Sequence, residues 1–329
     1  MTTKFFHSLR TAAVLTVAGI AASGSAVAAE ARLSALSFIP NHTAFGKPFA
    51  DWVEKINGEA KGTVQIEIKA SGSMSPFTMG NAVKSGVVDM VHLPHTFYQN
   101  LLPIGDAMKL NQKTPQELRE NGTVAFLNEL HNDKVNAEYL GHWGLNIPFH
   151  IYLRNKKIAG PDLSGLKLRI TPVYRAFFRA MGAELIQIPP ADVYTALERG
   201  TVDGLGWPQW DIKSFGWDKQ IKYRVDPGFY GTSEAFLINL DKWKTLDSAQ
   251  QAYLKKSFQD MEDEMWEKAK ELNKSYAKEQ ADAGVETITL SDEDVTKYRR
   301  MSYEAGWEEV LKLDPVNGPK MKELISGTY

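Results

Sequence analysis

The chain has 329 residues, of which 43% are hydrophobic and 24% charged, a composition typical of a globular protein with one large domain or two smaller ones. The absence of cysteine excludes disulfide bonds, thiolate metal sites and a cysteine nucleophile. A formal net charge of −2 gives no electrostatic case for binding nucleic acid.

The first residues predict a secretory signal peptide, residues 1–28. Lys4 and Arg10 make its start basic, and residues 11–22 form an apolar run too short to span a bilayer comfortably. Small residues then match a cleavage site that ends at Ala28. We expect cleavage there and export of a soluble chain, since no later stretch is apolar enough for a membrane helix. An uncleaved anchor is the alternative.

The N-terminal third alternates strands and helices. Residues 31–38 and 63–70 alternate apolar side chains with small or polar ones, which predicts two strands. Residues 47–60 place apolar side chains at helical spacing between them. Residues 79–93 begin as a helix, break at Gly86 and continue as a strand. This order is typical of an α/β sheet.

The same order returns in the middle of the chain. The patterns predict strands at 144–155, 166–170, 184–189, 201–208 and 233–243, and helices at 173–183, 190–200, 246–284 and 292–313. The helix over 246–284 begins at Asp247 as its N-cap and ends at Gly284. It is unusually long for a globular protein, and a helix of this length can hold two lobes together.

Residues 82–94 and 196–208 form a weak internal repeat. Both follow the pattern A-x-x-x-G-x-V-D-x-x-x-x-P, a helix ending in glycine, then a strand and a loop. Chance recurrence of common turn residues is one explanation. The other is two lobes of similar construction, each presenting a strand end to one cleft, because open α/β sheets bind ligands outside the carboxyl ends of their strands.

The segment GLKLRITP, residues 165–172, suggests an anion site. Apolar residues alternate with Lys167 and Arg169, so both cations lie on one face of a short strand that Pro172 ends. A solvated strand edge or an ion pair between lobes is one explanation for Arg169. An anion clamp is the other, because a guanidinium is planar, always charged and matches a carboxylate with two hydrogen bonds.

Residues 161–208 carry the motifs of a known family. They contain DLSGLKLRITP, followed at a specific spacing by MGAELIQIPPADVYTALERGTVDG. With the export signal and the long late helix, essentially the whole mature chain resembles the solute-binding proteins of tripartite ATP-independent periplasmic (TRAP) transporters, of the dicarboxylate-receptor (DctP) type. The resemblance implies an α/β, two-lobed periplasmic binding protein (type II-like) with a central ligand cleft, hinge strands and a helix spanning both lobes.

We expect the two lobes to be discontinuous in sequence. Lobe I is expected at residues 29–150 plus 236–278, and lobe II at 151–235 plus 279–329.

The resemblance also implies ligand-binding residues. The family's signature arginine, which forms a salt bridge with the ligand carboxylate, corresponds to Arg169. A second cation or polar group corresponds to His150, with Arg154 as the alternative contact. Trp207 stands where many relatives carry asparagine, which predicts a flatter, more apolar ligand surface. His95 matches a ligand-facing position of the first lobe.

Five further residues are candidates for the cleft wall, with packing in the core as the alternative for each. They are Phe77, Tyr174, Tyr230, Trp210 and Asn41. His92 and His95 have a spacing that suits a metal, but no third ligand is apparent, so we predict neither a metal nor a cofactor.

We expect a receptor that captures a small organic acid in the periplasm and delivers it to the small and large TRAP membrane subunits. Aromatic side chains such as Trp207 and Phe149 favour an aromatic or hydroxy/keto monocarboxylate. A C4-dicarboxylate or sugar acid is the alternative within the family. A binding protein of an ATP-driven transporter or a sensor would have a similar fold, although the long helix favours the TRAP type. An exported enzyme is disfavoured because G-x-S-x-G, H-E-x-x-H and phosphate-loop motifs are absent.

Overall fold

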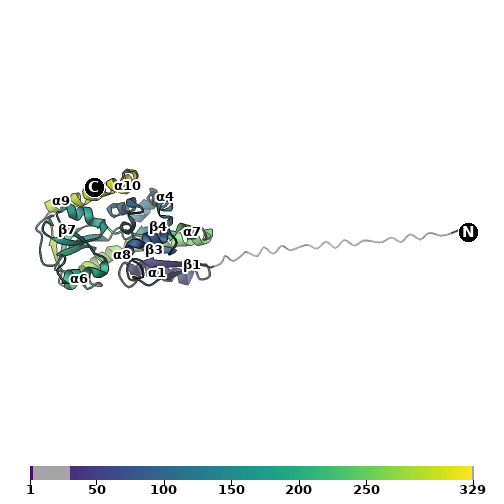
Figure 1. The fold of residues 1–329 in the computed structure, drawn as a ribbon, viewed down its shortest axis with the longest axis horizontal. Helices are drawn as coiled ribbons and strands as arrows, with labels where there is room; N and C mark the ends of the chain where they lie inside the picture. Colours follow the sequence, from purple (N-terminus) through teal and green to yellow (C-terminus); the bar gives the residue numbers. More distant parts are fainter. Residues whose placement is uncertain (3–29, 328–329) are drawn as a thin grey trace.

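The structure is a computed structural model that describes residues 1–2 and 30–327 (Figure 1). The expected cleavage site after Ala28, and nearly all of the expected signal peptide, lie outside the described residues. None of the helices within these ranges is both long enough and apolar enough to cross a bilayer. The described chain forms two lobes, each built around one β-sheet.

The first lobe contains a five-stranded sheet in the order β2-β1-β3-β10-β4. Its strands are β1 (Ala31–Ser37), β2 (Val64–Ile68), β3 (Met90–Pro94), β4 (Ala137–Trp143) and β10 (Glu234–Asn239). β1 runs parallel to β2 and β3, whereas β10 runs antiparallel to β3 and β4. Because β10 enters in the opposite direction, its first residue, Glu234, lies opposite Pro94 at the end of β3.

The second lobe contains a six-stranded sheet in the order β11-β9-β5-β8-β6-β7. Its strands are β5 (Pro148–Leu153), β6 (Lys167–Ile170), β7 (Glu184–Gln187), β8 (Gly204–Pro208), β9 (Tyr223–Gly231) and β11 (Glu286–Thr289). β6 runs parallel to β7 and β8, and β5 runs antiparallel to β8. Phe149 near the start of β5 therefore lies opposite Pro208 at the end of β8.

Helices cover both sheets (Figure 1). They are α1 (Gly46–Glu59), α2 (Met79–Lys84), α3 (Pro115–Glu120), α4 (Thr123–Val135), α5 (Arg175–Ala180), α6 (Val193–Glu198), α7 (Leu240–Trp243), α8 (Ser248–Asp282), α9 (Asp292–Leu313) and α10 (Gly318–Ile325). The short 3₁₀ helices are η1 (Pro76–Thr78), η2 (His95–Tyr98), η3 (Pro103–Leu110), η4 (Pro172–Tyr174), η5 (Pro190–Asp192) and η6 (Trp217–Lys219). α1 packs on β2 and α4 on β4, while α9 packs on α5 and reaches η3 of the first lobe.

The strand and helix order predicted for the N-terminal third is confirmed by β1, α1, β2, α2 and β3. The single strand predicted at 144–155 was wrong in its first part, because the chain turns there and β5 begins only at Pro148. Gly144 has a φ of 91°, and the Ile147 N–H donates to its carbonyl at 2.8 Å. A left-handed turn of this kind is not visible in an apolar alternation.

Several other segments differ from the sequence prediction. The strand predicted at 233–243 ends at Asn239, whose side chain accepts a hydrogen bond from the Lys242 N–H and so caps α7. β4, β9, β11 and the helices α3, α4 and α10 were not predicted. β9 holds Pro227 and a glycine on either side of its aromatic pair, which hides the strand pattern.

The long late helix is confirmed as α8, and it contacts both lobes. In its first half Lys255 forms an ion pair of 2.7 Å with Glu138 of β4. Near its end the Gln280 amide donates to the carbonyl of Gln209, just after β8, at 2.6 Å. The helix therefore links the two sheets along one side of the molecule.

Besides its passage along α8 from β10 to β11, the chain crosses between the lobes at residues 144–147 and 232–233. Thr232 binds both ends of the first crossing, because its hydroxyl donates to the Gly144 carbonyl at 2.7 Å and its N–H donates to the Ile147 carbonyl at 3.0 Å. A Cβ on Gly144 would lie 2.3 Å from the Thr232 hydroxyl oxygen, so the two crossings approach as closely as glycine allows.

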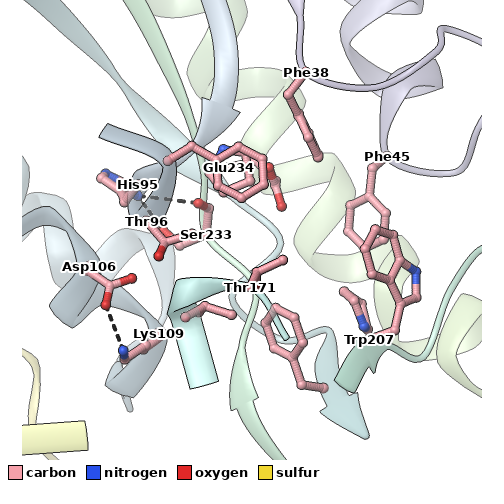
Figure 2. A pocket seen from close by; sticks show the side chains of 15 residues that line it. Phe38, Phe45, His95, Thr96, Asp106, Lys109, Thr171, Trp207, Ser233 and Glu234 are labelled. Atoms are coloured by element: carbon pink, nitrogen blue, oxygen red, sulfur yellow. Dashed lines mark hydrogen bonds and ion pairs between the residues drawn. The ribbon is translucent and has the colours of Figure 1, made fainter. Parts of the chain in front are cut away.

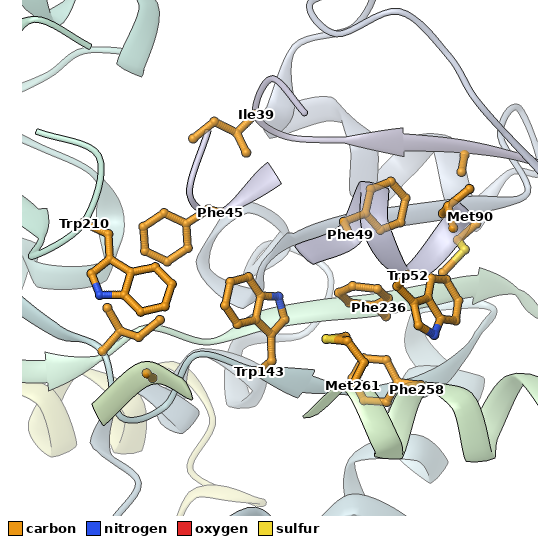
Figure 3. Packing of buried hydrophobic residues seen from close by; sticks show 14 of the residues in the cluster. Ile39, Phe45, Phe49, Trp52, Met90, Trp143, Trp210, Phe236, Phe258 and Met261 are labelled. Carbon is orange, nitrogen blue, oxygen red and sulfur yellow. The ribbon is translucent and has the colours of Figure 1, made fainter. Parts of the chain in front are cut away.

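One core cluster extends from the first lobe into the second (Figure 3). It includes Phe49 and Phe236 from the first lobe and Trp210 from the second. Phe45 lies between them, with its ring centroid 5.8 Å from that of Trp143 and 5.6 Å from that of Trp210. Aromatic burial of this kind contributes roughly 1.5–3 kcal/mol per side chain, so the lobes are in close apolar contact here.

The N-cap of α8 provides a test of the fold. Asp247 accepts a hydrogen bond from the Gln250 N–H at 2.8 Å and is part of a capping box. Asp247→Ala is expected to lower the free energy of unfolding by about 1 kcal/mol, measured by urea denaturation. Asp247→Asn is the control and should cost much less, because asparagine caps nearly as well. Equal losses in the two variants would contradict the capping role.

Candidate functional site

A small cavity lies between the two sheets (Figure 2). It is lined by Phe38, Phe45, Pro94, His95, Thr96, Phe97, Asp106, Lys109, Phe149, Thr171, Val173, Trp207, Pro208, Ser233 and Glu234. Most of the surface facing it is aromatic or aliphatic, with a few polar groups, as in small-molecule binding sites.

Strand ends from both lobes form the walls of the cavity. Phe38 follows β1 and Pro94 ends β3 in the first lobe, while Thr171 follows β6 and Pro208 ends β8 in the second. Both copies of the A-x-x-x-G-x-V-D repeat therefore deliver their final proline to one cavity. This is the position at which open α/β sheets bind ligands.

Arg169 is fully buried and is held on two of its three nitrogens. Its Nε donates to the Ile188 carbonyl at 2.9 Å, and Nη1 donates to the Tyr174 hydroxyl at 3.0 Å and to the Gly206 carbonyl at 3.4 Å. Nη2 is buried and has no hydrogen-bond partner. No carboxylate in the described part of the chain forms an ion pair with this guanidinium.

Burial lowers the pKa of Arg169 from its usual value, and the Tyr174 hydroxyl acts in the opposite direction. The guanidinium nevertheless stays charged, because arginine is not deprotonated in proteins. A buried cation with one free donor is costly unless another group pairs with it.

Arg169 is not itself in the cavity lining, but it is next to it through Trp207. The guanidinium carbon lies 5.3 Å from the centre of the Trp207 ring system, a cation–π contact, and Trp207 lines the cavity. The indole N–H of Trp207 donates to the Trp210 carbonyl at 3.1 Å, which fixes the ring. Thr171, two residues after Arg169, also lines the cavity.

His95 lines the cavity from the first lobe. Its Nδ1 lies 2.9 Å from the Ser233 hydroxyl oxygen, while Nε2 is buried without a partner. Burial lowers the pKa of His95 well below its usual value, and the nearby His142 and His131 lower it further. The ring is therefore neutral near pH 7 and can offer one donor and one acceptor, but no charge.

Lys109 is the only lysine in the lining, and its charge is already matched. Its Nζ lies 2.6 Å from the Asp106 carboxylate, and both side chains are at most 3% exposed. Glu309 of α9 lies 3.4 Å from the same nitrogen. Because two carboxylates surround Lys109, it is not a free cation for a ligand.

Glu234 and Thr96 add two polar atoms without partners to the first-lobe wall. Oε2 of Glu234 and Oγ1 of Thr96 are both buried and have no hydrogen-bond partner. Burial raises the pKa of Glu234 well above its usual value. Burial without a partner therefore favours the neutral form of this carboxyl.

His150 and Arg154 lie outside the cavity lining. Nδ1 of His150 is 3.0 Å from both the Val225 carbonyl and the Asp226 carboxylate, while Nε2 is buried without a partner. Burial raises the pKa of Asp226, but hydrogen bonds from His150 and Arg224 outweigh it and hold the pKa at about 2.

Arg154 follows the other end of β5, and its N–H donates to the Asp203 carbonyl at 2.9 Å. It is thus at the end of the sheet remote from Phe149 and Pro208.

The other sequence candidates are not in the cavity lining. Phe77 packs on Phe97, with ring centroids 4.8 Å apart, and Tyr174 holds Arg169. Trp210 donates its indole N–H to the Asn273 side chain at 2.7 Å, and the Tyr230 hydroxyl donates to the Ser302 carbonyl at 2.7 Å. Asn41 is exposed on the loop after β1.

The two histidines considered for a metal, His92 and His95, have other contacts in the structure. No group of three or more histidine, aspartate or glutamate side chains among the described residues is arranged to hold an ion. His92 has both ring nitrogens within reach of other groups, Ser37 at 3.0 Å and the Trp143 indole at 3.4 Å.

The sequence interpretation missed several lining residues, including Phe38, Thr96, Lys109 and Glu234. Glu234 begins a strand that was predicted, but only the antiparallel insertion of β10 beside β3 brings it to the cavity. Lys109 lies on η3, a 3₁₀ helix that the sequence interpretation did not identify. For Glu234, the available sequence signal was a polar residue at the boundary of a predicted strand.

One contact joins the lobes directly beside the cavity. Asp211, in the loop after β8, accepts hydrogen bonds from the N–H of Ala44 at 2.7 Å and of Phe45 at 3.3 Å in the first lobe. Burial raises the pKa of Asp211, whereas these backbone hydrogen bonds lower it. Because Phe45 lines the cavity, this contact fastens the second lobe over one wall of the site.

Two similar α/β lobes that enclose one cavity, joined by two crossings and a shared helix, define the class of two-lobed binding proteins. The model of bacterial extracellular solute-binding protein family 7 (DctP) matches residues 37–311. The chain therefore belongs to this family, and the resemblance to TRAP solute-binding proteins drawn from its motifs is confirmed.

Solved structures share the fold over nearly the whole described chain. A TRAP periplasmic solute-binding protein from Desulfovibrio salexigens with bound orotic acid is 20% identical, covers 89% of this chain and 97% of its own, and superposes with a TM-score of 0.80. A Bordetella pertussis extracytoplasmic solute receptor binding pyroglutamic acid is 18% identical, covers 89% and 99%, and has a TM-score of 0.79. The expected two-lobed α/β fold is thus confirmed.

A curated relative is similar in sequence. The monocarboxylate 2-oxoacid-binding periplasmic protein of Nostoc sp. is 22% identical over 262 residues, which is 76% of this chain and 71% of the relative.

The contact between Asp211 and the first lobe predicts an effect on ligand release. Asp211→Asn should weaken ligand binding by about tenfold, mainly through faster dissociation, because a charged acceptor of two N–H groups is lost from the closed arrangement. Stopped-flow tryptophan fluorescence would measure the rate. Asp192→Asn, at an exposed aspartate of the same lobe, is the control. An unchanged dissociation rate in Asp211→Asn would contradict this role.

Proposed function

We propose that the chain is an extracytoplasmic receptor that binds a small organic acid through Arg169 and passes it to a TRAP transporter. The observation that carries the proposal is the buried Nη2 of Arg169, which has no partner although Nε and Nη1 of the same group are held. A ligand carboxylate beside Trp207 and Thr171 would supply the missing acceptor and the missing negative charge. Binding of this kind makes or breaks no covalent bond.

The anion contact alone does not account for useful affinity. A hydrogen bond to a charged group contributes about 1.5–3 kcal/mol, whereas millimolar affinity requires about 4 kcal/mol. The remainder must come from burial of apolar ligand surface against the aromatic lining. Closing the lobes also lowers the local dielectric, which strengthens the ion pair.

The lining favours a compact, flat monocarboxylate. Phe38, Phe45, Phe97, Phe149 and Trp207 all line the cavity. A C4-dicarboxylate would need a second free cation, but Lys109 is paired with Asp106. The ligands named for similar proteins, orotic acid, pyroglutamic acid and 2-oxoacids, fit this description and support an aromatic, cyclic or keto monocarboxylate.

Delivery requires partners and a location. The expected signal peptide and the family support a periplasmic receptor that docks on small and large membrane subunits.

We place the lobe boundaries at the crossings 144–147 and 232–233, a few residues from the boundaries expected from the sequence. α10 packs on η3 and α4, so we assign it to the first lobe rather than the second. The lobes would move about these crossings as hinges.

Arg169→Ala is expected to weaken binding of small carboxylates at least tenfold by isothermal titration calorimetry, because the charged donor is removed. Arg169→Lys should also lose affinity, since a single ammonium cannot reproduce the fork. Arg175→Ala is the control, because that arginine lies on the same lobe and bonds the Gln187 side chain near the surface. Wild-type affinity in Arg169→Ala would refute the proposed function.

Phe38→Ala is expected to change ligand preference. Phe38 directly follows β1, is partly exposed and lines the cavity. Loss of its ring should weaken binding of aromatic acids several-fold, while small aliphatic acids are little affected. Competition binding with benzoate and pyruvate measures the ratio. Phe77→Ala is the control, because Phe77 touches Phe97 but not the cavity. The same ratio in wild type and Phe38→Ala would argue against an aromatic ligand surface.

A further inference from the structure

The first-lobe wall of the cavity contains a carboxyl group that the structure leaves without a partner. Glu234 is only 4% exposed, lines the cavity, and has a buried Oε2 with no hydrogen bond. No lysine, arginine or histidine in the described part of the chain forms an ion pair with it. The one lysine of the lining, Lys109, is paired with Asp106 and Glu309.

Glu234 and the Arg169–Trp207 pair belong to different sheets, and Figure 2 shows Glu234 and Trp207 at different sides of the cavity. A ligand that reaches both therefore has its carboxylate toward the second lobe and another group toward Glu234. A charged Glu234 would repel such an anion, and burial also disfavours its charge. The carboxyl consequently meets the ligand as a neutral acid.

A neutral carboxyl presents one donor, its O–H, beside one acceptor, its carbonyl. The group complementary to this pair is a cyclic amide, whose N–H and C=O lie side by side and form two hydrogen bonds with the acid. We propose that Glu234 selects organic acids that carry a lactam or cyclic imide, so that the ligand is a carboxylate with an N–H/C=O pair in its ring. This inference rests on the proposed function and names its substrate class.

Two neighbouring groups agree with a polar ligand edge on this wall. His95 offers a buried Nε2 and Thr96 a buried Oγ1, both without partners and both in the lining. An acid with a purely hydrocarbon ring would leave all three groups unsatisfied, and each unpaired buried polar group costs affinity. The same apolar cavity would therefore discriminate strongly between isosteric rings.

The test compares ligands of nearly equal shape by calorimetry in the presence of EDTA. Pyroglutamate carries the lactam, its lactone analogue replaces the ring N–H with oxygen, proline replaces the lactam with an ammonium, and cyclopentanecarboxylate has neither group. The wild-type protein should bind pyroglutamate at least about tenfold more tightly than each of the others. Equal or tighter binding of the lactone, of proline or of cyclopentanecarboxylate would overturn the inference, as would pyroglutamate binding that requires an added divalent cation.

Two variants locate the effect at Glu234. Glu234→Leu should reduce the pyroglutamate-to-lactone ratio to near one while cyclopentanecarboxylate still binds, which also shows that the variant is folded. Glu234→Gln should restore most of the ratio, because its amide again offers a donor and an acceptor. A ratio unchanged in Glu234→Leu, or lost equally in Glu234→Gln, would overturn the lactam pairing but leave carboxylate binding intact. Failure of every acid to bind the wild type would instead refute the proposed function.

Discussion

The site depends on one buried cation whose environment satisfies it incompletely. Main-chain carbonyls of Ile188 and Gly206 and the Tyr174 hydroxyl fix the Arg169 guanidinium, while its Nη2 is left without an acceptor. Holding the group rigidly removes most of the side-chain entropy cost of binding before a ligand arrives. The unpaired nitrogen then provides a charged donor next to an apolar cavity, where an ion pair is stronger than in water.

The remainder of the fold brings a second wall to this cation. Parallel strands direct their carboxyl ends to one edge of each sheet, and the crossings near Gly144 and Thr232 turn those two edges toward each other. α8 and the aromatic contact of Phe45 with Trp210 keep the lobes together, and Asp211 adds backbone hydrogen bonds across the mouth. Ligand burial and lobe contact are thus parts of one arrangement.

Much of this arrangement was predictable from local sequence. Strand and helix periodicity located most elements, the repeat ending in Pro94 and Pro208 indicated two strand ends at one cleft, and the motif around Arg169 indicated the family. Side-chain direction was harder to predict. Trp207 on β8 lines the cavity, whereas Trp210, only three residues later, does not, because its indole bonds Asn273 of α8.

Groups brought in from distant segments were not predictable. Glu234 reaches the cavity because β10 inserts antiparallel between β3 and β4, and Lys109 reaches it on a 3₁₀ helix that packs on α9. His150 was expected at the ligand; it lies opposite Trp207 in the pairing of β5 with β8, but it is not in the cavity lining and its Nδ1 is held by Val225 and Asp226. Sequence alone does not show which partners from distant strands will hold such a side chain.

The central claim is tested most directly by a crystal structure of the protein with a carboxylic acid that binds it in calorimetric titrations. The account predicts a carboxylate oxygen within hydrogen-bond distance of Nη2 of Arg169, with the rest of the ligand against the aromatic lining. A carboxylate bound elsewhere, with Nη2 still unpaired, would contradict it.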